Sequence, residues 1–296
     1  MNADGGRFES GNGVPEKRIA FVLSGGGNRG AFEVGVLMAL LEHDIRPQIV
    51  VGTSVGAINA AAIANDPTEE GARWLAEVWR GITRATVMPS NYLSMVWRLI
   101  TGESGLCTNQ NLRNFLESHF PEGVHRFADI KGAELYITAV DLQTGQLHVF
   151  GKDRSESVLD AIMASCALPV LLAPWQYRGR QYVDGAVISG LPVGVAVEMR
   201  ATEIYAIDVG QRRTARASLR GIFGIIGQTL NAVTQKQVVD ELSRARRRHQ
   251  AGVHYIRVDV YEGLRIWDFS RTAEMIKAGR KVGLGYLQGP RPDSGF

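Results

Sequence analysis

The sequence predicts a three-layer α/β/α sandwich with a mainly parallel central sheet. Short apolar runs typical of buried strands alternate with segments of helical periodicity along the whole chain. Near the N-terminus, two of these runs lead directly into glycine-rich turns, and each turn opens a helix. Strands joined through helices pair in parallel, and the helices then cover both faces of the sheet.

Composition favours one globular domain. The chain has 296 residues, of which 45% are apolar and 21% charged, which is sufficient for a large core. Because no repeat, linker or break in composition interrupts it, we expect one domain over residues 17–289, a disordered leader over 1–16 and a tail over 290–296. The leader lacks the apolar segment of a secretory signal, and no stretch makes a convincing membrane span.

Charge and cysteine content exclude several classes of partner. A net charge of +3 is too small to indicate nucleic-acid binding. Two cysteines, Cys107 and Cys166, cannot form a disulfide framework, and neither has a metal-type spacing. We therefore expect a reducing, cytoplasmic environment and neither a metal nor a cofactor. The oligomeric state is not predicted.

A glycine-rich turn follows the first strand, residues 18–23, and precedes a helix over 31–42. Its sequence, GGGNRG at 25–30, satisfies G-x-G-x-x-G, so a dinucleotide or phosphate site is one alternative. That site requires an acidic residue at the end of the second strand, where this chain has Val51-Gly52-Thr53-Ser54 instead. The turn is instead suited to hold an oxyanion through its amides. Arg29 would add a positive charge, or lie on the surface paired with Glu33.

The second strand, residues 49–51, leads into Gly52-Thr53-Ser54-Val55-Gly56, a G-x-S-x-G nucleophile elbow. In such an elbow the serine occupies a sharp strand-to-helix turn, and the glycines allow neighbouring backbone to approach. The alanine-rich run at 57–64 provides the following helix.

The remaining chain continues the alternation. Further helices are expected at 68–81, 109–119, 157–165, 192–199, 222–250 and 270–287. Further strands are expected at 135–140, 146–150, 175–178, 181–183, 203–207 and 255–260. The apolar stretch at 92–100 is interpreted as core rather than as a lip over a pocket.

A nucleophilic serine requires a base, and aspartates at strand ends are better placed for this role than the histidines. None of the six histidines follows a late strand, as the base of an α/β-hydrolase does. Asp141, Asp184 and Asp208 each end a predicted strand, where the active sites of open α/β sheets lie. Spacing alone does not choose among the three.

Several motifs, in this order, resemble the patatin-like phospholipase family: GGGNRG at 25–30, GTSVG at 52–56, ASCALP at 164–169 and DGA at 184–186. The resemblance covers residues 17–288. It implies a lipid acyl hydrolase of phospholipase A or lysophospholipase type that acts on phospholipids or lysophospholipids through a serine–aspartate dyad without histidine. An acyltransferase or thioesterase with the same dyad is the alternative.

Carried over by motif, Ser54 is the nucleophile and Asp184 the proton acceptor. The resemblance also implies an oxyanion hole formed by Gly25, Gly26, Gly27, Arg29 and Gly30. Full proton transfer from a serine hydroxyl to an ordinary aspartate would cost on the order of 12 kcal/mol. A strong oxyanion hole is therefore essential to such a dyad.

One further cluster concerns membranes. The long helix at 222–250 begins with apolar residues and ends in four arginines, Arg244, Arg246, Arg247 and Arg248. Cations at a helix C-terminus are stabilised by the helix dipole, so an ordinary solvated end is the favoured interpretation. Peripheral contact with an anionic membrane is the alternative.

Overall fold

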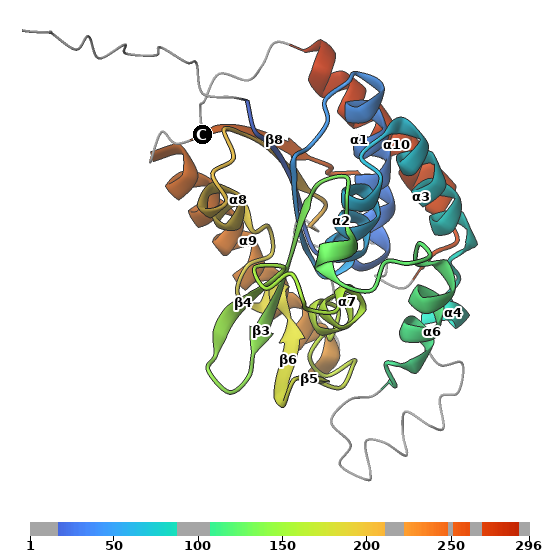
Figure 1. The fold of residues 1–296 in the computed structure, drawn as a ribbon, viewed down its shortest axis with the longest axis vertical. Helices are drawn as coiled ribbons and strands as arrows, with labels where there is room; N and C mark the ends of the chain where they lie inside the picture. The colour runs from blue at the N-terminus through green and yellow to red at the C-terminus, as the bar shows by residue number, and fades with distance from the viewer. Residues whose placement is uncertain (1–16, 88–106, 211–221, 248–250, 261–267, 290–296) are drawn as a thin grey trace, which may run out of the picture.

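A central sheet lies between two layers of helices (Figure 1). The structure, a computed structural model, describes residues 17–87, 107–210, 222–247, 251–260 and 268–289. The predicted α/β/α sandwich is confirmed. Both predicted end segments and the stretch at 92–100 lie outside the described residues.

The elements follow the predicted alternation of strands and helices. The strands are β1 (Ile19–Leu23), β2 (Ile49–Thr53), β3 (Glu134–Asp141), β4 (Gln146–Phe150), β5 (Trp175–Tyr177), β6 (Arg180–Asp184), β7 (Glu203–Asp208) and β8 (Gly252–Arg257). The helices are α1 (Gly30–Glu42), α2 (Val55–Asn65), α3 (Glu69–Gly81), α4 (Arg84–Val87), α6 (Gln110–His119), α7 (Val158–Ser165), α8 (Val193–Glu198), α9 (Ile222–Arg247) and α10 (Thr272–Gln288).

The sheet is mixed. In the described chain its strand order is β5-β6-β3-β2-β1-β7-β8, with β4 also paired to β3. The five strands from β3 to β8 in that order are parallel, whereas β4 and β6 pair antiparallel with β3, and β5 with β6. Helical connections produce the parallel part, and the two predicted hairpins, β3–β4 and β5–β6, produce the antiparallel extension.

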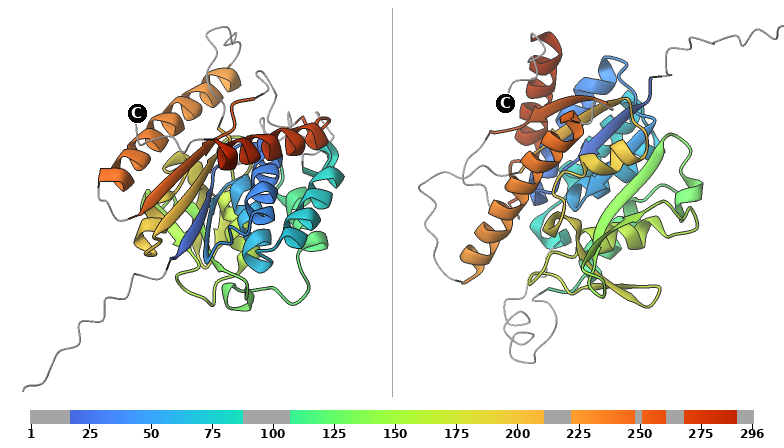
Figure 2. Two further views of the ribbon diagram at one scale, coloured as in Figure 1. Left: turned by 90° about the horizontal axis from the view of Figure 1, so that it is seen from above. Right: turned by 90° about the vertical axis from the view of Figure 1, so that its left-hand side faces the viewer.

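Each face of the sheet packs against its own helices (Figure 2). In β1, Phe21 and Leu23 belong to the larger core with α1, α2 and α3, whereas Ala20 and Val22 belong to the core with α8 and α9. Both sets are fully buried. A strand buried on both faces reads as a continuous apolar run, which is why IAFVL has no polar alternation.

The largest difference from the predicted bounds is at strand β8. Strand β8 covers Gly252–Arg257, three residues earlier than the expected 255–260, because it pairs in register with all of β7. Helix α9 is described over Ile222–Arg247, and its predicted end at residue 250 lies outside the described residues.

Candidate active site

Ser54 occupies a strained turn between β2 and α2. Its backbone φ of 56° lies in the left-handed region and its ψ is −129°, a conformation that residues other than glycine rarely adopt. A Cβ on Gly52 would lie 2.3 Å from the carbonyl oxygen of Gly56, and one on Gly56 would lie 2.6 Å from that of Ser24. The two glycines thus permit the close backbone packing that the elbow requires.

Hydrogen bonds from β3 and α7 hold this turn. The Ser54 N–H donates to Ser165 Oγ at 2.7 Å, and that hydroxyl donates to the carbonyl oxygen of Thr138 at 2.7 Å. The hydroxyls of Thr53 and Thr138 also share a hydrogen bond of 2.5 Å. Ser165 belongs to the ASCALP block, but its sequence context predicts no role for it.

Strand β3 brings Asp184 to Ser54. The last residue of β2, Thr53, pairs with Thr138 of β3, and Asp184, at the end of β6, pairs with the next residue, Ala139. Because β6 runs antiparallel to β3, the ends of β2 and β6 meet head to head on one edge of β3. The residues that end or follow these two strands are therefore adjacent.

Asp184 is buried in an environment that favours a strong base. Its side chain is 1% exposed. Burial raises its pKa from 3.8 to about 6, although hydrogen bonds from the Ser54 hydroxyl and the Ala186 N–H act in the opposite direction. The Ala186 bond, 2.8 Å long, fixes one carboxylate oxygen at the start of the DGA turn. Asp184 is thus ionised at neutral pH and more basic than an exposed aspartate.

The two other candidate aspartates have other partners. Asp141 forms an ion pair with Arg180. Asp208 accepts hydrogen bonds from Tyr255 Oη at 2.6 Å and from the Gly210 N–H at 2.8 Å. Of the three candidates, Asp184 alone lines the cavity that contains Ser54.

Histidines are absent from the described lining of that cavity. His254, for example, is bound to Glu203 and Tyr286 at the β7–β8 side of the sheet. His249 lies outside the described residues.

The glycine-rich turn lies beside the elbow because β1 and β2 pair in parallel. A Cβ on Gly25 would lie 3.2 Å from Ser54 Cβ, so this residue sets a close approach. Its N–H donates to Gly190, however, and the N–H groups of Arg29 and Gly30 donate within the turn itself. The N–H groups of Gly26 and Gly27 have no hydrogen-bond acceptor among the described residues. Of the five predicted oxyanion-hole residues, Gly26 and Gly27 are thus the two whose N–H groups have no acceptor within the described chain.

Arg29 is buried, so the alternative that it is a surface residue is wrong. It is 3% exposed, and its Nε donates to the carbonyl oxygen of Val209 at 2.5 Å. Burial lowers its guanidinium pKa, and the nearby carboxylates of Asp259 and Asp208 partly compensate. Arg29 is therefore neither a surface residue paired with Glu33 nor part of the cavity lining. It anchors the end of β7 to the turn.

The cavity around Ser54 has a volume of about 270 Å³ and is mainly apolar. Ser54 and Asp184 are the polar side chains in its described lining apart from the Cys166 thiol. The lining consists of Gly25, Gly26, Gly27, Ser54, Val55, Ile58, Trp79, Ile82, Leu112, Phe115, Cys166, Leu168, Leu171, Leu172, Asp184, Ala186 and Phe269. Such a site can place one hydroxyl and one carboxylate against a long apolar ligand.

Comparison with known proteins identifies the family. The sequence model of the patatin-like phospholipase family matches residues 21–197, and the chain belongs to this family. Patatin-like phospholipase domain-containing protein 7 of Rattus norvegicus is 30% identical over 195 residues, covering 66% of this chain and 14% of that protein. Lysophospholipase NTE1 of Saccharomyces cerevisiae is 27% identical over 301 residues, covering 92% of this chain and 16% of that protein. The chain thus spans a small part of these relatives.

Among solved structures, VipD from Legionella pneumophila matches with a TM-score of 0.45 and 14% identity, covering 92% of this chain and 67% of that chain. Human GIVD cytosolic phospholipase A2 matches with a TM-score of 0.45 and 12% identity, covering 92% and 58%.

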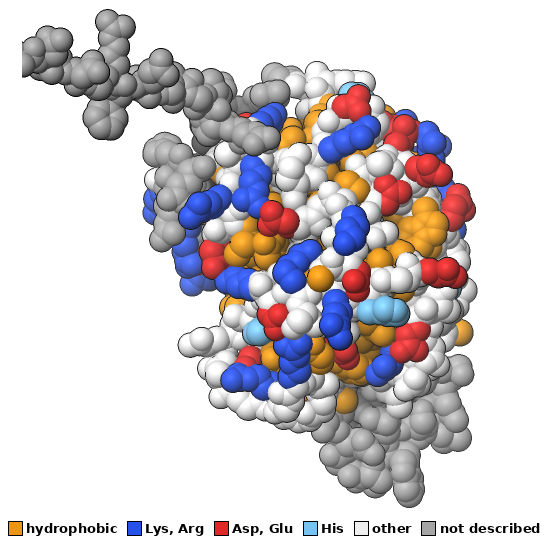
Figure 3. Space-filling model, in the orientation of Figure 1, with side chains coloured by type: hydrophobic (Ala, Val, Ile, Leu, Met, Phe, Trp, Pro, Cys, Tyr) orange, Lys and Arg blue, Asp and Glu red, His pale blue; other side chains and the backbone are white. Residues whose placement is uncertain are grey.

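The described surface bears on the predicted membrane contact. No helix in the described ranges is long and apolar enough to span a bilayer. Arg244 and Arg247 of α9 are exposed, whereas the side chains of Arg246 and Arg248 lie outside the description. On the face in Figure 3, basic and acidic side chains are interspersed over the described surface.

Proposed function

We propose that this protein is a lipid acyl hydrolase of phospholipase A or lysophospholipase type. The observation that carries the proposal is that Ser54, on a strained elbow, and the buried Asp184 line the same apolar cavity, where the Ser54 hydroxyl helps to hold the pKa of Asp184 down. Family membership and the names of the relatives support the same activity.

In the proposed reaction, Ser54 Oγ attacks the ester carbonyl carbon while its proton passes to Asp184. Collapse of the tetrahedral intermediate breaks the bond to the alcohol, which takes the proton from Asp184 and leaves an acyl-Ser54. Water then attacks the acyl group, gives a proton to Asp184, and the fatty acid departs as Ser54 recovers that proton. The raised pKa of Asp184 lowers the cost of each transfer to the carboxylate, by about 3 kcal/mol relative to an ordinary aspartate.

The negative charge of the tetrahedral intermediate requires donors beside Ser54. We assign this role to the N–H groups of Gly26 and Gly27, which line the cavity and have no acceptor within the described chain. An amide donor of this kind contributes about 10²–10³ to kcat when it is preorganised. Gly25 serves a different purpose, because its lack of a side chain lets the turn approach Ser54.

The experiment that tests this function is product analysis with 1-acyl lysophosphatidylcholine and with a diacyl phospholipid. Wild type should release free fatty acid in water, and Ser54→Ala should reduce the rate by at least about 10³. Ser118→Ala, at an exposed serine, serves as the matched control and should retain full activity. Transfer of the acyl group to an added alcohol or thiol in preference to water would favour the acyltransferase alternative. Equal release by Ser54→Ala and wild type would refute the proposal.

A further inference from the structure

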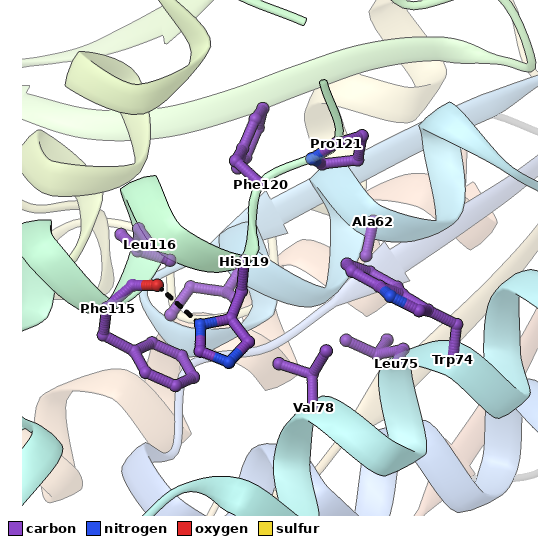
Figure 4. Close-up of a pocket in the computed structure, with 10 residues that line it drawn as sticks. Ala62, Trp74, Leu75, Val78, Phe115, Leu116, His119, Phe120 and Pro121 are labelled. Atoms are coloured by element: carbon purple, nitrogen blue, oxygen red, sulfur yellow. Dashed lines mark hydrogen bonds between the residues drawn. The ribbon is translucent and has the colours of Figure 1, made fainter.

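Two side chains separate the cavity around Ser54 from a second, smaller cavity. Ile58 of α2 and Phe115 of α6 line both cavities. The second has a volume of about 30 Å³ and lies between α2, α3 and α6, as Figure 4 shows. Ile58 and Phe115 therefore form a shared wall.

The second cavity is apolar and opens toward the surface. Its lining residues are Ile58, Ala62, Trp74, Leu75, Val78, Phe115, Leu116, His119, Phe120 and Pro121. Trp74 is 41% exposed and His119 is exposed, so this lining reaches solvent. The His119 ring stacks on Phe115 with a centroid distance of 4.4 Å, and its Nδ1 lies 2.9 Å from the Phe115 carbonyl oxygen (Figure 4). These contacts hold the Phe115 ring, which is 8% exposed, in the wall.

We propose that Ile58 and Phe115 determine acyl-chain length by closing the cavity around Ser54 on the side of the second cavity. This inference rests on the proposed function, because it takes the apolar cavity as the acyl site. A cavity of 150 Å³ accommodates the six carbons of benzene, or roughly 25 Å³ per carbon. On this scale 270 Å³ holds about eleven carbons. Longer chains meet the wall, and the apolar space behind it becomes accessible from the Ser54 side only when the wall is removed.

The test measures binding of saturated fatty acids from C8 to C18 by displacement of a fluorescent apolar probe, so it does not depend on hydrolysis. In wild type, affinity should rise about fourfold per methylene up to ten or eleven carbons and then level off. Phe115→Ala removes six carbons from the wall and connects the two cavities, so affinity should continue to rise to about C16. Ile58→Ala removes fewer atoms and should also move the plateau to longer chains. It replaces Phe115→Ala in the test if that variant does not fold.

Ala62→Leu provides the matched control. Ala62 lines only the second cavity and not the cavity around Ser54, so Ala62→Leu by itself should leave the wild-type binding profile unchanged. Combined with Phe115→Ala, it should reverse the increase in affinity for longer chains. A wild-type affinity that rises steadily to C18 would overturn the inference. So would a plateau that neither wall variant shifts. Absence of ester hydrolysis in wild type would count against the proposed function instead, and the binding profile would still decide the role of the wall.

Discussion

Replacing Asp184 with asparagine should stabilise the protein while abolishing hydrolysis. Burial raises the pKa of this carboxyl from 3.8 to about 6, which means that the folded state disfavours its ionised form. Two pKa units correspond to about 3 kcal/mol at neutral pH. Asparagine carries no charge and can still accept the Ala186 hydrogen bond, so Asp184→Asn should raise the free energy of unfolding by about 1–3 kcal/mol at pH 7–8.

The stability gained by Asp184→Asn should depend on pH. Between pH 3.8 and 6 the folded protein holds a proton on Asp184 that the unfolded chain releases, so this group's contribution to stability falls as pH rises. The advantage of Asp184→Asn should therefore be near zero below pH 4 and complete above pH 7. Wild-type kcat/KM should fall about tenfold per pH unit below pH 6, because the protonated carboxyl cannot act as a base.

Urea unfolding from pH 4 to 8, with ester hydrolysis on the same samples, measures both effects. Asp141→Asn is the matched control, since it makes the same chemical change at the other end of the β3–β6 pairing. The Asp141 pKa is lowered: burial acts to raise it, but hydrogen bonds from Arg180, Gln143 and Thr144 outweigh that effect. Asp141→Asn should therefore destabilise the protein and retain activity. An Asp184→Asn variant that is less stable than wild type at pH 8, or that keeps near wild-type kcat, would refute the reasoning.

Three further predictions follow from buried and exposed charges. Burial raises the pKa of Glu33 to about 8, so stability should fall as pH rises from 4.5 to 8, and Glu33→Gln should remove this dependence in urea unfolding at pH 6–9. An unchanged slope would contradict the assignment. His254→Ala should keep kcat within about tenfold of the wild-type value. A loss of several orders of magnitude in a folded variant would instead support a triad with a catalytic histidine. If the arginines of residues 244–248 contact anionic lipid, co-sedimentation with anionic liposomes should decrease as salt is added. It should also decrease when Arg246, Arg247 and Arg248 are replaced by glutamine. Equal sedimentation of variant and wild type across the salt series would exclude that contact.

Much of the fold was predictable because local pattern and tertiary structure agree. Strand β1 is apolar on both faces and ends in a glycine turn, which predicts a buried parallel strand and the start of α1. The site was less predictable. The choice of Asp184 depends on β6 meeting β2 on the edge of β3, a contact between residues more than a hundred positions apart.

Arg29 shows the same limit. Its partners Val209 and Val258 lie about 180 and 229 residues away, and no local pattern identifies them. Ser165 is held in a similar way, because its hydroxyl connects Ser54 with Thr138. A sequence motif marks these residues, but only the assembled sheet shows what each one contacts.

Labelling with an alkyl fluorophosphonate tests the central claim most directly. A nucleophilic Ser54 should displace fluoride and gain one phosphonyl group, which intact mass and peptide mapping would place on the peptide containing residues 52–56. Ser54→Ala should not be labelled, and Asp184→Asn should be labelled at least about 10² times more slowly because the hydroxyl has lost its base. Wild-type protein that stays unlabelled, or labelling that persists at another residue in Ser54→Ala, would contradict the account.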